Sequence, residues 1–470
     1  MPDDFVVAPD LGQIEDEVLE ALENDNAARI REILGHLHPS DAAELISRLP
    51  FSELRVAVFR EVPDEQAGDV LDLLPEAVRS DLVEGLSTSE LIEAVAEMAP
   101  DDAADLVTEL EPEAREEVLE HIPAAQSEEI RELMQYPPDT AGGLMTPRYT
   151  ALRSDMTVEQ AVETLRRLAD SDQEIIYYAY VVDDRERLLG VLSLRDLLLA
   201  RSHQRVADVM NPNVLSVDVM TDREEVARMF DRYDFLAIPV VDAEKRLLGV
   251  VTVDDAIEVM QNEQSEDVQK MGGVQALEEP YMYASIGHLV RKRGLWLSGL
   301  FIGEMLTASA MAHYEDEIAR AVVLALFVPL IISSGGNSGS QASTLVIRAM
   351  ALGEVRAADW WRILRRELAC GGLLGLLLGF IGFVRVHLWQ YLGWVDYTPH
   401  YHLVGLTVAF SLVGVVLWGT LVGSMLPLLL RLLRLDPAAI SAPFVATLAD
   451  VTGLVIYFSV ATLILGGTLL

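Results

Sequence analysis

Apolar residues dominate the C-terminal part of the chain in five stretches, at about 294–313, 319–347, 367–391, 402–430 and 443–468. Each stretch reaches the roughly 20 residues with which a helix crosses about 30 Å of hydrocarbon. The pattern therefore predicts a domain of five membrane-spanning helices over residues 291–470. The second stretch contains Pro329 and the run SSGGNSGSQ at 333–341. We expect this run to break the helix and to line a cavity with carbonyls and short side chains.

Short amphipathic helices punctuated by proline are predicted for residues 1–139. Three segments resemble one another: HPSDAAELISRLP (38–50), VPDEQAGDVLDLLP (62–75) and APDDAADLVTELEP (99–112). In each segment a proline lies at or near a helix start, and acidic residues follow where the positive end of the helix dipole favours them. Leucines then recur at helical spacing. Stacked short helices of this kind predict an all-α superhelical domain.

A second internal repeat covers residues 140–203 and 204–258. RLLGVLSLRDLLLA (187–200) matches RLLGVVTVDDAIEV (246–259), and an apolar strand precedes each of them. Each unit opens with Met-Thr-Pro or Met-Asn-Pro, and its pattern predicts an α/β unit of β-α-β-β-α order. The acidic segment EVMQNEQSEDVQKMGG then predicts a helix that ends at Gly272-Gly273, so that residues 259–290 connect the repeat to the membrane.

The distribution of charge divides the chain at the same place. Residues 1–290 contain 64 acidic and 23 basic residues, whereas residues 291–470 contain 10 and 12. A formal net charge of −39 beside a positive mean hydropathy of +0.26 is therefore typical of a membrane protein with a large acidic, water-exposed part. That part argues against nucleic acid as a partner. The single cysteine, Cys370, excludes a disulfide framework and a zinc–thiolate site.

The positions of the basic residues predict the membrane topology. They precede the first stretch and follow the second and fourth: Arg291, Lys292, Arg293, Arg348, Arg356, Arg362, Arg365, Arg366, Arg431 and Arg434. The loops between the other stretches are acidic or aromatic, and the N-terminus MPDDFVVAPD does not resemble a signal peptide. The positive-inside rule then predicts a multi-pass protein of the cell (inner) membrane with its N-terminus in the cytoplasm and its C-terminus outside.

Two carboxylates fall within the predicted spans, Asp450 in the fifth and Glu304 in the first. A charged side chain in hydrocarbon costs at least about 2.5–3.5 kcal/mol, so Asp450 should face a bundle interior, a water-filled cavity or an ion. Two plainer interpretations stay open. Asp450 could cap the last helix at the interface, and the glycine-rich run could be a seam of small residues for helix packing. Pro437 and Pro443 should prevent a continuous helix through DPAAISAPF. Together these features predict a path for a cation.

Four segments resemble the MgtE family of magnesium channels: YPPDTAGGLMTP (136–147), the two repeats, PLIISSGGNSGSQ (329–341) and DPAAISAPFVATLADVTG (436–453). The repeats themselves resemble a pair of CBS domains with the signature Gly-h-h-Ser/Thr-x-x-Asp. The resemblance covers essentially the whole chain and implies an acidic helical N domain, a CBS pair, a plug helix and five spans. It also implies a homodimer in the lipid membrane, with Asp450 of each subunit binding the permeating Mg²⁺ on the two-fold axis.

By the same resemblance, cytosolic Mg²⁺ closes the pore by bridging acidic residues of the N domain, the CBS pair, the plug helix and the loop that it touches. The implied metal ligands are Asp101, Asp105, Asp222, Glu224, Asp234, Asp255, Glu258, Glu263, Glu266, Asp267 and Asp436. Family members can also bind ATP at the CBS pair, where Tyr178, Arg195 and Asp196 match the nucleotide positions. The alternative is that Asp196 and Asp255 only cap the helices that follow them.

The pore wall is expected to contain Gly335, Gly336, Asn337, Ser340, Ala442 and Pro443. Relatives often have asparagine at the positions of Ser340 and Ala442, so conductance or selectivity should differ here. Mg²⁺ prefers octahedral oxygen at about 2.0–2.1 Å and gives up water reluctantly. One Asp450 per chain is too little to strip it, so we expect a hydrated ion held through its waters. Acidic cytosolic faces should separate when Mg²⁺ is scarce and close when it neutralises them.

Other classes are weaker matches. A zinc protease attached to CBS domains needs HExxH, and in this sequence no histidine is followed by glutamate. In ClC-type chloride channels the CBS units follow the spans, and an anion path would not place an aspartate in the last span. Transport of Co²⁺, Ni²⁺ or Mn²⁺, or a membrane-tethered nucleotide sensor, are the alternatives that stay open. We expect no enzymatic activity.

Overall fold

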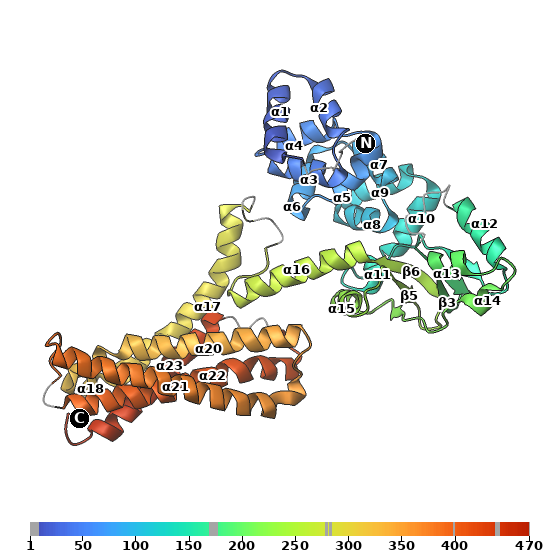
Figure 1. Cartoon of the computed structure of the whole chain (residues 1–470). Coiled ribbons are helices and arrows are strands. Elements are labelled where there is room, and N and C mark those ends of the chain that lie inside the picture. The colour runs from blue at the N-terminus through green and yellow to red at the C-terminus, as the bar shows by residue number, and fades with distance from the viewer. Residues whose placement is uncertain are drawn as a thin grey trace, which may run out of the picture. The chain divides into compact units, whose positions relative to one another are not determined.

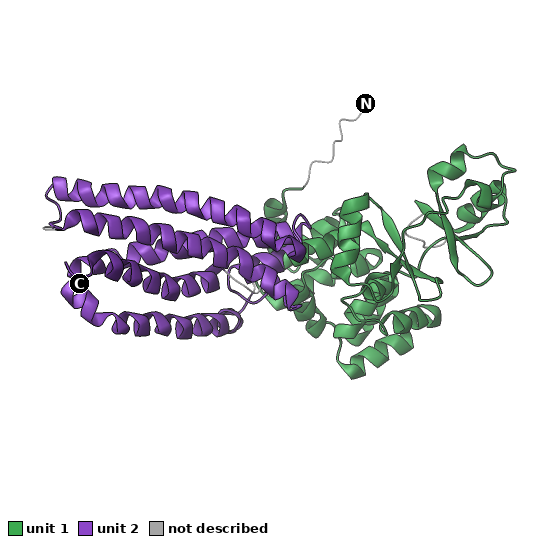
Figure 2. Cartoon of the chain, turned by 90° about the horizontal axis from the view of Figure 1, so that it is seen from below, with its two compact units in different colours: residues 1–263, 278–283 green, residues 264–277, 284–470 purple. Residues whose placement is uncertain are grey.

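The computed structural model describes residues 9–168, 177–277, 281, 284–397, 400–437 and 442–469. The chain forms two compact units, which Figure 2 colours separately. The first contains residues 1–263 and 278–283, and the second contains residues 264–277 and 284–470. The N-terminal helices and both α/β repeats thus belong to one unit, and the long apolar helices belong to the other.

Helices α1 to α10 build the N-terminal domain (Figure 1). Their bounds are Leu11–Glu23, Ala27–Leu34, Pro39–Arg48, Ser52–Phe59, Asp64–Asp72, Glu76–Gly85, Thr88–Glu97, Pro100–Glu109, Pro112–His121 and Ala124–Leu133. Proline lies at the first helical position of α3, α8 and α9 and directly before α5, α6 and α10, where a missing N–H is tolerated. The three similar segments form α3, α5 and α8, so the predicted all-α domain is confirmed.

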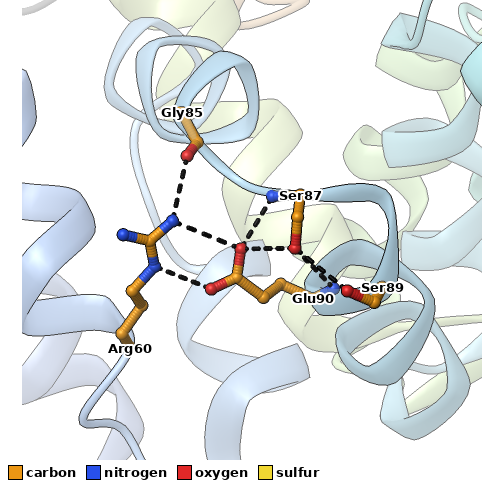
Figure 3. A network of polar contacts seen from close by, with 5 residues as sticks. All are labelled: Arg60, Gly85, Ser87, Ser89 and Glu90. Carbon is orange, nitrogen blue, oxygen red and sulfur yellow. Dashed lines mark hydrogen bonds and ion pairs between the residues drawn. The ribbon is translucent and has the colours of Figure 1, made fainter.

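A polar network joins the end of α4 to the start of α7 (Figure 3). Ser87 caps α7, and Glu90 accepts a hydrogen bond from the Ser87 N–H at 2.7 Å, which completes a capping box. Arg60 donates from Nε to Glu90 at 2.7 Å and from Nη2 to the Gly85 carbonyl at 3.4 Å. The Arg60 guanidinium and the Ser87 donors lower the pKa of Glu90 to about 2, so this carboxylate stays charged and holds the two helices together.

Each α/β repeat contains a three-stranded sheet. The strands are β1 (Ala151–Arg153), β2 (Tyr178–Val182) and β3 (Leu188–Ser193), then β4 (Val217–Asp218), β5 (Ala237–Val241) and β6 (Leu247–Thr252). In both sheets the first strand is parallel to the second and the second is antiparallel to the third. The helices are α11 (Ala141–Leu144), α12 (Val158–Leu168), α13 (Leu194–Leu199), α14 (Val206–Val209) and α15 (Arg223–Tyr233). The predicted β-α-β-β-α order is confirmed.

The buried apolar residues show how these parts are joined. One continuous core runs from Val18 in α1 through the N-terminal helices to Ala256, so the N domain and the second repeat share their interior. The first repeat has its own core around Leu152 and Val181. A small cluster that includes Tyr180 and Val250 packs the two repeats together. Acidic groups on the N-terminal helices are thereby held against the second repeat.

Helix α16 (Val253–Met271) is both the last helix of the second repeat and the predicted plug helix. It therefore starts inside residues 204–258, earlier than the expected start of the connecting segment at 259. It ends before Gly272-Gly273, as the sequence indicates, and Gly273 has a φ of 73°, which favours glycine after a helix end. The next helix begins only at Ile286, so residues 259–290 are not one helix.

Five helices are long and apolar enough to cross a membrane, which confirms the predicted number of spans. They are α17 (Ile286–His313), α20 (Val328–Ala351), α21 (Trp360–Tyr391), α22 (Tyr401–Leu432) and α23 (Ala442–Leu465). Two short helices, α18 (Glu315–Arg320) and α19 (Val322–Ala325), precede α20, and the 3₁₀ turn η1 (Ala357–Asp359) precedes α21. In the described part of the loop between α22 and α23, helix ends at Leu432 and resumes at Ala442.

The predicted break at SSGGNSGSQ is wrong, because α20 runs without interruption from Val328 to Ala351. The glycines pack the helix against α22 instead. A Cβ on Gly419 would meet the Gly335 carbonyl, and one on Gly423 would meet the Gly339 carbonyl. These four residues, here called the glycine seam, bring two backbones into contact in the way that small residues do in membranes. The chain bends earlier, between α19 and α20, where Pro329 lies in the first turn.

Candidate metal sites, transport path and nucleotide pocket

Asp450 lies in the third turn of α23, where that helix packs against α20. A Cβ added to Gly336 would lie 3.6 Å from Asp450 Oδ1 and 3.3 Å from the Ala446 Cβ. The absence of a side chain at Gly336 therefore leaves the carboxylate room beside α20. Asp450 is half-buried and well inside the helix, so the alternative in which it caps the last helix is wrong.

A row of polar groups on α20 continues from this carboxylate. Asn337 is exposed, and its Nδ2 donates to Ser333 Oγ at 3.4 Å, one helical turn away. Gly335, by contrast, is buried against Val415 in the glycine seam. Of the expected pore-wall residues on α20, Asn337 is thus exposed, whereas Gly335 and Gly336 are both buried, Gly335 against α22 and Gly336 against α23.

Ser340 and Ala442, two of the residues expected in the pore wall, contact each other. The Ser340 hydroxyl donates to the Ala442 carbonyl at 3.1 Å and so links α20 to the first residue of α23. Pro443 follows at a half-buried position. The short serine side chain reaches the Ala442 carbonyl directly. A longer asparagine would place its amide group farther from the α20 backbone. Two of the residues expected in the pore wall are therefore joined by one hydrogen bond between α20 and α23.

Helix α17 approaches the same region. A Cβ on Gly303 would lie 2.9 Å from Thr447 Cγ2, so glycine allows α17 to approach α23 closely. Glu304, the next residue, is exposed. Only 6% of the apolar window of α17 is buried, compared with 56% for α22. Most of α17 thus presents apolar side chains outward, while the acidic side chains Glu304 and Asp450 lie on neighbouring helices.

A cluster of carboxylates lies between the N-terminal helices and the start of α16. The pKa of Asp105 is raised to about 6, mainly because the surrounding protein removes its hydration; Arg79 lowers it, and the charges of Glu109, Asp72 and Glu258 raise it. Burial likewise raises the pKa of Asp72 to about 6, again opposed by Arg79 and reinforced by Glu258. Asp72 is half-buried and Asp105 keeps an exposed surface, so the cluster borders solvent and a cation can reach it.

Asp255 belongs to the same cluster. Burial is the main cause that raises its pKa to about 7, and the charges of Asp254 and Asp72 add to it. Its Oδ2 also accepts from the Thr252 hydroxyl at 2.7 Å at the start of α16. Asp255 therefore both caps α16 and belongs to the acidic cluster. Asp101, another predicted ligand, lies half-buried in the first turn of α8, one turn before Asp105.

The predicted ligands of the second repeat lie at the two ends of α15. Asp222 is the N-cap, and its side chain accepts from the Glu224 N–H at 2.9 Å, while Glu224 pairs with Arg228. Arg223 binds Glu263 of α16 at 3.1 Å. Asp234 is the left-handed C-cap at the opposite end. An 11-residue helix spans about 16 Å, so Asp234 cannot share an ion with Asp222 within one chain.

At the end of α16, a lysine joins two of the predicted metal ligands. Lys270 Nζ lies 2.7 Å from Glu266 Oε1 and 2.9 Å from Asp436 Oδ2. Burial alone would lower the pKa of Lys270, but its bonds to Asp436 and Glu266 raise it, so the amine is charged. Asp267 is half-buried beside this group. The plug helix and the loop that follows α22 are thus linked by a side-chain cation.

The acidic groups fit a hydrated ion better than a dehydrated one. Within the described residues, no three His, Cys, Asp or Glu side chains are close enough to hold one metal ion directly. The carboxylates at Asp72, Asp105 and Asp255 instead oppose one another across helix boundaries. Mg²⁺ usually keeps several waters and takes only one or two carboxylates, so a site for it does not need three side chains in direct contact with the ion.

A pocket of about 200 Å³ opens between the two α/β repeats. Its lining includes Tyr178 and Asp196, two of the three predicted nucleotide residues, together with Tyr180 and Phe235. The Tyr180 hydroxyl is buried and has no hydrogen-bond partner among the described residues. Arg195 is exposed and does not line the pocket. Aromatic walls, a carboxylate and an unsatisfied hydroxyl match the purine and ribose of a nucleotide.

Asp196 also caps α13, because its Oδ2 accepts from the Ser193 N–H at 3.2 Å and from the Ser193 hydroxyl. The capping interpretation is therefore correct for Asp196 without excluding a ligand. Sequence reasoning missed three groups at these sites: Asp72, Lys270 and Tyr180. Asp72 had a detectable signal, because it belongs to the second of the three similar segments. The pairing of Lys270 with Glu266 at i,i+4 was also detectable, whereas its bond to Asp436 and the buried hydroxyl of Tyr180 depend on distant residues.

Models of three known families match the chain. The divalent cation transporter family MgtE matches residues 328–460, the MgtE intracellular N domain matches residues 37–139, and the CBS domain matches residues 141–203 and 206–262. The matches follow one another in the order that the sequence motifs indicate, and they coincide with the two units of the structure.

Similar curated proteins share this organisation. The magnesium transporter MgtE of Thermus thermophilus is 43% identical over 95% of this chain and 97% of its own length. The protein of the same name from Bacillus subtilis is 36% identical over 73% of this chain and 74% of its own. A crystal structure of the cytosolic domain of the Mg²⁺ channel MgtE in complex with ATP covers 52% of this chain at 41% identity, with a TM-score of 0.49. The chain belongs to the MgtE family.

Proposed function

We propose that this protein conducts Mg²⁺ through the membrane as a homodimer and closes when cytosolic Mg²⁺ is abundant. Its relatives are named magnesium transporters, and one observation on this chain supports the same cargo. Asn337 and Ser333 form an exposed polar row on α20, next to the half-buried Asp450. Such groups are unfavourable against lipid, so they must face water and a second copy of the row.

The ion passes hydrated in this proposal. Two subunits bring two Asp450 carboxylates to the axis, and each can accept hydrogen bonds from the waters that surround Mg²⁺. Direct ligation would require more oxygens than this wall offers. The proposed topology follows the arginines, with the acidic unit in the cytosol and the C-terminus outside. No enzymatic activity is proposed.

Replacing Asp450 tests the path. Asp450→Ala should abolish high-affinity Mg²⁺ uptake by the full-length protein in liposomes, because hydrated Mg²⁺ loses its only carboxylate partner on α23. Glu354→Gln is the matched control, since it removes an exposed carboxylate from the loop after α20. Uptake at unchanged affinity in Asp450→Ala would contradict the assignment. A parallel assay with Co²⁺, Ni²⁺ and Mn²⁺ separates Mg²⁺ transport from transport of another divalent cation.

Closure is proposed to arise from charge neutralisation. Asp72 repels both Asp105 and Asp255 when all three are ionised, and this repulsion disfavours the closed form. Mg²⁺ between them favours the closed form by its differential affinity for that form. Asp101, Asp222, Glu224, Asp234, Glu258, Glu263, Glu266, Asp267 and Asp436 are proposed to contribute in the same way.

Protease sensitivity tests closure. Cleavage of the full-length protein within residues 260–275 should slow when MgCl₂ is added, because the plug helix becomes packed. NaCl at the same ionic strength is the control, since screening alone would weaken repulsion without bridging. Equal cleavage rates with and without Mg²⁺ would contradict the gating proposal.

ATP is the proposed nucleotide at the CBS pair. The pocket of about 200 Å³ is smaller than the roughly 300–1,000 Å³ of typical ligand sites, so it would hold the adenosine part and leave the phosphates near Arg195. Tyr180→Phe should weaken ATP binding about fivefold, the loss of one hydrogen bond of about 1 kcal/mol, measured by calorimetry.

Tyr149→Phe provides the control for the nucleotide experiment. The Tyr149 hydroxyl already donates to the Leu247 carbonyl at 3.0 Å, and it lies outside the pocket. This variant should bind ATP as the wild type does. Binding that is unchanged in Tyr180→Phe, or lost equally in both variants, would remove Tyr180 from the site.

A further inference from the structure

An apolar groove of about 430 Å³ lies on the membrane domain where α21 begins and α22 ends. Its lining includes Ala357 and Trp360 at the start of α21, Leu429 and Leu432 at the end of α22, and Leu448 of α23. Trp360 and Leu429 are about half exposed. Every lining side chain is apolar apart from the indole N–H of Trp360, so the groove suits a hydrocarbon chain and not a soluble polar ligand.

Basic residues adjoin the lining residues of this groove in the sequence, although the Arg431 guanidinium donates to the Met350 carbonyl at 3.4 Å. Arg356 directly precedes Ala357, and Arg431 directly precedes Leu432. Arg362 follows Trp360 by two residues, and its side chain is 86% exposed although it also lies 3.3 Å from Asp359. Arg365 stacks over the Trp361 ring at 5.0 Å. The arginines and the adjacent tryptophans mark the level where the hydrocarbon meets the headgroups.

We propose that this groove is a binding site for an anionic phospholipid. One acyl chain lies along Leu429, Leu432 and Trp360, and the phosphate lies among Arg356 and Arg362. An apolar slot that begins beside Arg356 and the exposed Arg362 is complementary in charge to a ligand with one hydrocarbon tail and one negative head. By the positive-inside rule this is the cytosolic leaflet, where anionic lipids are attracted to basic residues.

The groove lies next to the loop that follows α22, so a lipid bound there would act on a segment that the plug helix contacts. Leu432 is the last residue of α22, and the loop that follows carries Asp436, which Lys270 binds. A lipid that joins the start of α21 to the end of α22 would fix the place from which this loop leaves the membrane. The inference concerns lipid binding and does not depend on the cargo of the transporter.

Binding of defined lipids to the full-length protein in neutral detergent tests the proposal. Phosphatidylglycerol should raise the melting temperature and bind in native mass spectra, and phosphatidylcholine should do so far less. Removing both arginines in Arg356→Gln/Arg362→Gln should weaken phosphatidylglycerol binding roughly 25-fold, since each basic residue contributes about fivefold. Ala357→Phe should weaken it with all charges intact, because the ring fills the slot.

Arg320→Gln is the matched control, as it removes one exposed arginine at the opposite end of the membrane helices and should leave binding unchanged. The melting temperature without added lipid shows whether each variant is folded. Three results would overturn the proposal: equal binding of both lipids, full binding by the double variant, or full binding by Ala357→Phe. A photoreactive residue at Leu429 that couples to a second protein copy instead of lipid would also overturn it.

Discussion

At the residue scale, the aspartate of the repeated signature has the same capping role in both repeats and a second role that differs between them. Asp196 and Asp255 occupy the same place in the two repeats, and both accept hydrogen bonds from the Ser or Thr three residues earlier. Asp196 then lines the pocket between the repeats, whereas Asp255 faces Asp72 of the N domain. The capping role follows from spacing, and the second role depends on what the rest of the fold brings nearby.

Lys270 offers a test at this scale. In Lys270→Met the carboxylates of Glu266 and Asp436 lose their shared cation, so they repel one another until Mg²⁺ replaces it. Cleavage of full-length protein within residues 260–275 should become about fivefold faster without Mg²⁺, corresponding to about 1 kcal/mol for a partly exposed pair. At high Mg²⁺ the variant should be as well protected as the wild type.

Lys245→Met is the control for that experiment, since Lys245 lies in the turn between β5 and β6. Its cleavage pattern should match the wild type. If Lys270→Met were instead better protected without Mg²⁺, the lysine would be holding the two segments apart, and the linking role assigned to it would be wrong.

At the scale of elements, the glycine seam explains how α20 remains a continuous helix and presents polar side chains on its other face. Gly335, Gly339, Gly419 and Gly423 remove side chains from one face of each helix, and the backbones meet. The opposite face of α20 is then left to Ser333 and Asn337. One glycine-rich segment thereby provides both a packing surface and a polar surface.

Replacing Gly423 tests the seam. Gly423→Ala places a methyl group against the Gly339 carbonyl, so α20 and α22 would have to move apart. Overpacking of this kind costs about 1–3 kcal/mol, which should lower the melting temperature of the detergent-solubilised protein measurably. Gly372→Ala is the control, because a Cβ there would meet no described atom within 4 Å. Equal melting temperatures for the two variants would refute the close approach.

At the scale of the whole molecule, protons and Mg²⁺ should both stabilise the cytosolic unit, because either one neutralises the acidic cluster. Asp72 and Asp105 have pKa values raised to about 6 and Asp255 to about 7, from an ordinary value of 3.8. Between pH 4 and 7 the folded protein therefore binds more protons at these groups than the unfolded chain. Their contribution to stability is complete below about pH 4 and is lost as the pH rises through 6 to 7.

Thermal unfolding of the full-length protein checks this expectation. Without Mg²⁺, the transition of the cytosolic unit should rise in temperature when the pH is lowered from 7.5 to 5. Mg²⁺ should raise it more at pH 7.5 than at pH 5, where protons already neutralise the cluster. Asp255→Asn should reduce the Mg²⁺ effect at pH 7.5, and Asp64→Asn, at an exposed position of α5, should not. A Mg²⁺ effect that is the same at both pH values would contradict the cluster.

The sequence determined the elements and their order. Proline at helix starts, leucines at helical spacing and apolar stretches of sufficient length are local signals, and they predicted α3, α5, α8, the paired repeats and the five spans. The motifs also predicted the family and directed attention to Asp450, Asp255 and Asp436. These inferences succeed because each depends on a residue and its near neighbours in the chain.

Only the tertiary structure decided what those residues touch. It showed that the glycine-rich run is a packing seam inside a continuous helix, since a partner backbone on α22 stabilises a conformation that glycine alone disfavours. It also brought Asp72 to Asp255, Lys270 to Asp436 and Ser340 to Ala442. Burial and charge act through space, and the distances that set them arise only when segments far apart in sequence have packed together.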